Sequence, residues 1–107
     1  MKASSVFDDI PTHLPEELIE TLAGDESVRI ERIVSRGHCS PEGFWYNQKQ
    51  NEWVILLTGS ARVSWDDAHE PALLRPGDYL HIPARRRHRI DWTAPERDTV
   101  WLAVFYG

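Results

Sequence analysis

Two short apolar segments constrain the fold of this chain more than any other feature of its sequence. The first runs from Glu52 to Gly59 and the second from Pro76 to Pro83, and turn-forming residues bound each of them. Short apolar runs of this kind are typical of strands in a small β-structure. Because Glu52 opens the first segment and His88 follows the second, we expect neighbouring strands to carry one carboxylate and one imidazole.

The same pattern extends over the rest of the chain after Gly24. The sequence predicts strands over residues 28–34, 44–47, 52–58, 61–65, 72–74, 79–82, 88–92 and 99–105, with turn residues between them. Short strands at such regular spacing indicate an all-β sandwich or barrel rather than a fold that alternates strands and helices.

Residues 15–23 show a different pattern, which predicts a short helix. Pro15 suits the first helical position, Glu16 and Glu17 favour the positive end of the helix, and Gly24 suits its end. We therefore expect residues 1–27 to form an arm and a short helix that caps a barrel domain of residues 28–107.

Length and charge exclude several classes of protein. A chain of 107 residues has room for one domain, and its net charge of −5 argues against nucleic acid as a main partner. No apolar run approaches the length of a membrane span, so we expect no membrane partner. The lone Cys39 cannot form an internal disulfide, which fits a cytoplasmic protein.

Side-chain alternation leaves two interpretations of Glu52. The carboxylate lies either at a solvated rim or inside the barrel, where it needs a partner because an unpaired buried charge is costly. If Glu52 points inward, Trp53, Ile55 and Leu57 point outward and form an apolar surface. Such a surface needs cover from the helix or from a second subunit, and we expect a homodimer.

The two segments also resemble the two signature motifs of the cupin superfamily, and the resemblance covers residues 37–105. In the first motif, G-x5-H-x-H-x3–4-E-x6-G, Glu52 and Gly59 match the second half. In the second, G-x5-P-x-G-x2-H-x3-N, the matches are Gly77, Pro83 and His88. The resemblance implies a cupin-type double-stranded β-helix, that is, a jelly-roll barrel. It also implies that Glu52 and His88 stand where two ligands of one divalent metal ion are found.

The chain departs from these motifs at several positions. The two histidine positions of the first motif fall on Trp45 and Asn47 or on Tyr46 and Gln48, and in the second motif Arg85 and Trp92 replace the Gly and the Asn. Amide oxygens bind late transition metals more weakly than imidazole does. The predicted metal ligands are Gln48, Glu52 and His88, with Asn47 as the alternative to Gln48, and zinc, iron, manganese or nickel as the ion.

A run of basic residues, Arg85 to Arg89, flanks His88. Guanidinium groups at a barrel mouth would attract a carboxylate or a phosphate, whereas a solvated turn would pair with nearby acidic residues. Aromatic residues near the expected site would give a pocket an apolar wall. The predicted ligand-binding residues are Tyr46, Arg86 and Trp92, for a small anionic organic ligand.

These patterns leave three functions open. The chain is expected to bind a divalent metal, a small ligand without metal, or only a partner subunit in a structural or regulatory role. No sequence pattern identifies a substrate or decides whether the protein is an enzyme.

Overall fold

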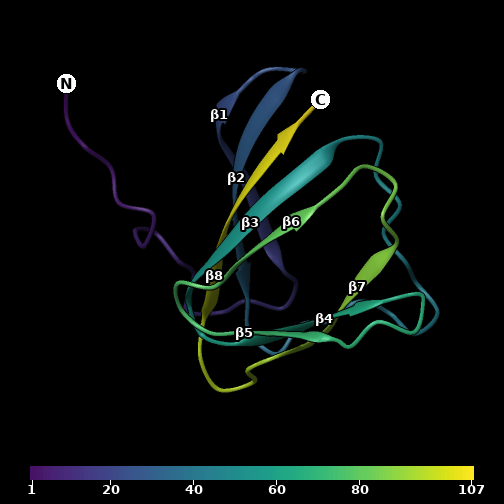
Figure 1. The fold of residues 1–107 in the computed structure, drawn as a ribbon. Coiled ribbons are helices and arrows are strands. Elements are labelled where there is room, and N and C mark those ends of the chain that lie inside the picture. The colour runs from purple at the N-terminus through teal and green to yellow at the C-terminus, as the bar shows by residue number, and fades with distance from the viewer.

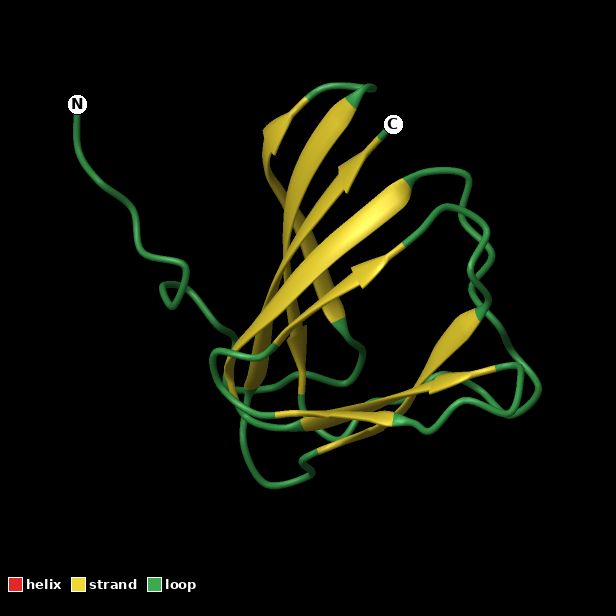
Figure 2. Cartoon of the chain, in the orientation of Figure 1, coloured by secondary structure: helices red, strands yellow, loops and turns green.

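The computed structural model describes residues 1–107 and consists of two antiparallel sheets (Figures 1 and 2). The larger sheet contains β1 (Leu18–Gly24), β2 (Val28–Ser35), β8 (Thr99–Tyr106), β3 (Asn51–Thr58) and β6 (Tyr79–Ile82), in that order. The smaller sheet contains β5 (Ala72–Leu74), β4 (Ala61–Trp65) and β7 (His88–Thr93). The predicted all-β jelly roll is confirmed, and no helix present could cross a membrane.

The predicted N-terminal helix is wrong. Residues 18–24 form β1, which pairs with β2 in antiparallel register from Leu18 opposite Val34 to Gly24 opposite Arg29. A helix of two turns is marginal in water, whereas an edge strand gains a full ladder of hydrogen bonds along β2. The Asp25 side chain accepts hydrogen bonds from the backbone N–H groups of Ser27 and Val28, so Gly24 begins a hairpin turn rather than ending a helix.

The other predicted strands are present to within one residue at each end, with one exception. Residues 44–47 form only a single bridge, in which Tyr46 and His88 exchange backbone hydrogen bonds of 2.7 and 3.2 Å. This bridge ties the segment before β3 to the first residue of β7, on the opposite sheet.

The core lies between the two sheets. Its residues come from β3, β4, β5, β6 and β8: Val54, Leu56, Ala61, Val63, Leu74, Ile82, Trp101, Ala103 and Phe105. Alternation along β3 turns Glu52 toward the same side as Val54 and Leu56. Glu52 therefore points into the barrel, which was one of the two expected orientations. Trp53, Ile55 and Leu57 lie half-buried on the outer face of the sheet.

Candidate functional site

A cavity of about 170 Å³ lies between the sheets at the β3 end that carries Glu52. Apolar and aromatic side chains make up most of its wall. The lining residues are Glu17, Ile19, Arg29, Glu31, Ile33, Tyr46, Gln48, Glu52, Val54, Val63, Ile82, His88, Ile90, Trp101 and Phe105. A mostly apolar pocket with a few convergent polar groups is the usual form of a small-molecule site.

Glu52 is the most deeply placed carboxyl group of this cavity. Only 7% of the residue is exposed, and its Oε1 accepts one hydrogen bond of 3.1 Å from the Gln48 amide. Burial raises the pKa of Glu52, and the neighbouring carboxylate of Glu31 raises it further; the Gln48 hydrogen bond and the charge of Arg29 act in the opposite direction. The carboxyl group therefore binds a proton more readily than a carboxyl group in water does.

His88 faces Glu52 from the other sheet. The residue is 3% exposed, and its Nδ1 lies 2.8 Å from the carbonyl oxygen of Arg86. A carbonyl oxygen only accepts, so Nδ1 carries the proton and Nε2 presents a lone pair to the cavity. Burial lowers the pKa of His88, which keeps the imidazole neutral.

The two polar groups converge on the same point of the cavity. His88 Nε2 lies 3.8 Å from Glu52 Oε1, which is too long for a hydrogen bond. Tyr46 stacks on the His88 ring at a centroid distance of 5.2 Å and fixes its plane. The cavity therefore holds a carboxyl group and a neutral imidazole side by side, both with free acceptor atoms.

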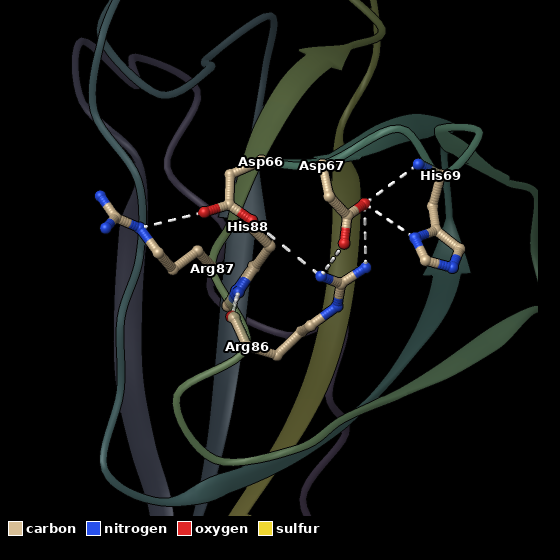
Figure 3. A network of polar contacts seen from close by, with 6 residues as sticks. All are labelled: Asp66, Asp67, His69, Arg86, Arg87 and His88. Atoms are coloured by element: carbon tan, nitrogen blue, oxygen red, sulfur yellow. Dashed lines mark hydrogen bonds and ion pairs between the residues drawn. The ribbon is translucent and has the colours of Figure 1, made fainter.

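The arginines of the basic run do not line this cavity. Figure 3 shows the contacts of two of them, Arg86 and Arg87. Arg86 forms an ion pair of 2.6 Å with Asp67 and stacks on the ring of Trp65, and Arg87 pairs with Asp66 at 3.3 Å. The hydrogen bond from Arg86 lowers the pKa of Asp67. Of the predicted ligand-binding residues, Arg86 thus contributes its backbone carbonyl to the site and not its guanidinium group.

Trp92 also lies outside the cavity. The residue is 41% exposed and lines a separate surface depression with Gly59 and Ser60. The pairing of β4 with β7 shifts register between Arg62 and Val63, because Ile90 pairs with Val63 and Trp92 pairs with Arg62. This bulge reverses the alternation after Ile90, so Trp92 points to the outer face although it follows His88 and Ile90 at even spacing.

Three of the four candidate metal ligands lie together in the cavity. Gln48, Glu52 and His88 all line the cavity, whereas Asn47 is exposed. Within the chain no group of three or more His, Cys, Asp or Glu residues could hold a metal ion. His81 does not join the site, because its Nε2 lies 2.8 Å from the Tyr106 hydroxyl on the outer face.

The donors that are present fit a weak metal site of three ligands rather than a closed site of four. They are one imidazole nitrogen, one carboxylate and one amide. Gln48 would have to turn its amide, because its NH2 group now points at Glu52.

Sequence reasoning missed the contribution of β2 to the cavity. Arg29, Glu31 and Ile33 line it at alternate positions of this strand, and Arg29 pairs with Glu31 at 2.7 Å while lying over the Phe105 ring at 4.6 Å. The i, i+2, i+4 spacing was visible in the sequence. The sequence did not show that these side chains point into the cavity, because charged residues on a strand usually face water.

Comparison with known proteins agrees with this architecture. The model of the cupin domain family matches residues 33–105, so the chain belongs to the cupin superfamily. A protein from Ralstonia eutropha, provisionally named a mannose-6-phosphate isomerase, is 43% identical, with a TM-score of 0.93 over 99% of this chain and 98% of that one.

Two more distant structures share the fold. A cupin superfamily protein from Desulfitobacterium hafniense is 21% identical, with a TM-score of 0.73 over 91% of this chain and 83% of that one. A conserved protein from Streptococcus pyogenes is 19% identical, with a TM-score of 0.76 over 98% of this chain and 86% of that one. No protein of curated function matches this sequence.

Proposed function

We propose that this cupin binds a small polar organic molecule inside its barrel and holds it between Glu52 and His88. The observation that carries the proposal is that His88 Nε2 and Glu52 Oε1 face each other across the cavity at 3.8 Å, an open pair to which the Gln48 amide is the only protein donor. Buried polar groups are normally paired, so an open pair in this cavity favours a ligand that donates to both of its atoms. Tyr46, Trp101 and Phe105 supply the apolar wall.

The Ralstonia relative supports a small-molecule ligand, since its provisional name describes an enzyme that acts on a sugar phosphate. The cavity matches only part of such a substrate. A phosphate group needs Arg, Lys or backbone donors, and the single arginine of the lining, Arg29, is already paired with Glu31. The anionic ligand expected from the sequence depended on Arg86, whose guanidinium group pairs with Asp67 instead.

The test is a ligand-observed NMR screen of small polar molecules against the wild-type protein. Hits are checked by competition with one another, and the screen is repeated on Glu52→Gln. Glu42→Gln is the matched control, because Glu42 is exposed and does not line the cavity. We expect hits that weaken at least about tenfold with Glu52→Gln and are unchanged with Glu42→Gln. Hits that respond equally to both variants, or no hit at all, would count against the proposal.

A divalent metal ion is the second candidate, favoured by the same convergence of Glu52, His88 and Gln48. Bound there, it would polarise a carbonyl or hydroxyl group of the ligand as a Lewis acid. Elemental analysis of untagged protein, reloaded with zinc, manganese, iron or nickel, tests this. Near-stoichiometric metal that is lost in His88→Ala would support the metal site, and the same content in both proteins would rule out His88 as a ligand.

The expected assembly and location belong to the same proposal. Cys39 is free and exposed, which supports a reducing compartment such as the cytoplasm. The half-buried apolar outer face of β3 supports a homodimer.

A further inference from the structure

The hydrogen-bonding groups of the cavity restrict the chemical class of the ligand more than the volume of the cavity does. His88 Nε2 is an acceptor, because Nδ1 donates to the Arg86 carbonyl at 2.8 Å. Glu52 is also an acceptor when ionised, and its only protein donor is the Gln48 amide. Two acceptors 3.8 Å apart call for a group that donates to both of them.

The charges around the cavity also favour a ligand that donates hydrogen bonds. Its lining contains three carboxyl groups, from Glu17, Glu31 and Glu52, and one guanidinium group, from Arg29. Arg29 is already paired, because Nε donates to Glu31 at 2.7 Å and Nη1 donates to Gln50 at 3.3 Å. The lining therefore carries more carboxyl groups than cations, and an anionic group would meet Glu52 beside a cation that already pairs with Glu31.

We propose that the ligand carries a primary ammonium group, which enters the gap between Glu52 and His88 and donates to both. An ammonium group has three N–H donors and no acceptor, and its positive charge complements the acidic lining. This inference rests on the proposed function of the cavity and names the class of ligand. The rest of the ligand lies against Tyr46, Trp101 and Phe105.

The experiment compares ethanolamine with glycolate, a hydroxyl compound of nearly the same size that ends in a carboxylate instead of an aminomethyl group. Inorganic phosphate and tetramethylammonium complete the set, because the latter carries positive charge without N–H donors. Binding to metal-stripped wild-type protein is followed by NMR shifts of Tyr46 and Trp101. We expect saturable binding of ethanolamine, none of glycolate or phosphate, and at least about tenfold weaker binding of tetramethylammonium.

Variants locate the binding site. Glu52→Gln and His88→Phe should each weaken ethanolamine at least about tenfold, whereas Glu42→Gln should leave it unchanged. The ligand comparison itself requires no variant, so the test survives if one of them fails to fold.

The outcomes separate this inference from the proposed function. Glycolate or phosphate binding as tightly as ethanolamine, or ethanolamine failing to bind while other molecules occupy the cavity, would overturn the ammonium proposal alone. If no small molecule occupies the cavity, the proposed function falls with it.

Discussion

Arg85 has a backbone conformation that residues with a Cβ atom rarely adopt. Its φ is 66°, and it stands at the position where the cupin motif has glycine. The left-handed region costs a non-glycine residue about 1–2 kcal/mol. Replacement by glycine removes this strain but increases the entropy of the unfolded chain by about 0.5–1 kcal/mol.

We therefore expect Arg85→Gly to raise the free energy of unfolding by about 0.5–1 kcal/mol. Urea denaturation measures this change. The control is Arg97→Gly, an exposed loop arginine without a positive φ, which should gain nothing. Equal effects of the two variants would show that the strain at Arg85 is not released.

Glu52 should make stability depend on pH. Its pKa is raised by burial, so the folded state holds this proton more tightly than the unfolded chain does. The cost of burying the ionised group therefore appears as pH rises above the ordinary value of 4.5 and is complete above the folded-state pKa. His88, Glu31 and Arg29 are the other ionisable groups close to it.

Glu52→Gln should consequently stabilise the protein by an amount that grows as pH increases. Unfolding by urea at several values between about pH 4 and pH 8 measures the difference from wild type. The exposed Glu42→Gln variant controls for the loss of one negative charge from the chain. A difference that stays constant over this range would mean that the folded-state pKa of Glu52 is not raised.

At the scale of the elements, the turn between β3 and β4 requires a residue without a side chain. A Cβ atom on Gly59, where φ is 83°, would lie 2.6 Å from the Cα of Thr99 on β8. Gly77 has a similar φ of 92°, and a Cβ there would have nothing within 4 Å. Substitution of either glycine therefore strains the backbone, and substitution of Gly59 also creates a steric clash.

Gly59→Ala should lower the free energy of unfolding by at least about 1 kcal/mol more than Gly77→Ala does. Thermal or urea denaturation of both variants gives the comparison. Equal losses would mean that the β3–β4 turn can move away from β8 without cost.

A strand could be predicted from the sequence where local interactions determine it, and not where pairing with a distant strand does. The strands from β2 to β8 were predictable because their alternation and turn residues are local signals. The segment at 18–24 was not, because pairing with β2 overrides a weak helical pattern. Motif spacing singled out Glu52, His88, Gln48 and Tyr46, which all line the cavity, whereas the outward direction of Trp92 follows from a bulge in β7 that no local pattern announces.

At the scale of the whole molecule, the outer face of the larger sheet is covered by the N-terminal arm at Arg32 on β2 but not over β3 and β6. Its outward residues on β3, β6 and β8 carry no Asp, Glu, Lys or Arg: Trp53, Ile55, Leu57, Tyr79, His81, Leu102, Val104 and Tyr106. Because the chain has a net charge of −5, this part of the face, which carries no carboxylates, is where two copies can approach without repulsion.

We expect a homodimer through this face, with light scattering after size exclusion as the measurement. Leu102→Glu should yield monomer, since the two-fold axis places the new charge on both sides of the interface. Leu73→Glu, at an exposed position of β5 on the other sheet, should leave the dimer intact. A monomeric wild-type protein, or a Leu102→Glu variant that remains dimeric, would contradict this arrangement.

We infer that a ligand completes the open pair of His88 and Glu52 inside the barrel. The most direct measurement is the long-range ¹H–¹⁵N NMR spectrum of the His88 imidazole, free and with the tightest molecule from the screen. We predict a neutral ring protonated on Nδ1, with an Nε2 resonance that shifts on saturation. A ring protonated on Nε2, or an Nε2 resonance that no bound molecule moves, would contradict the account.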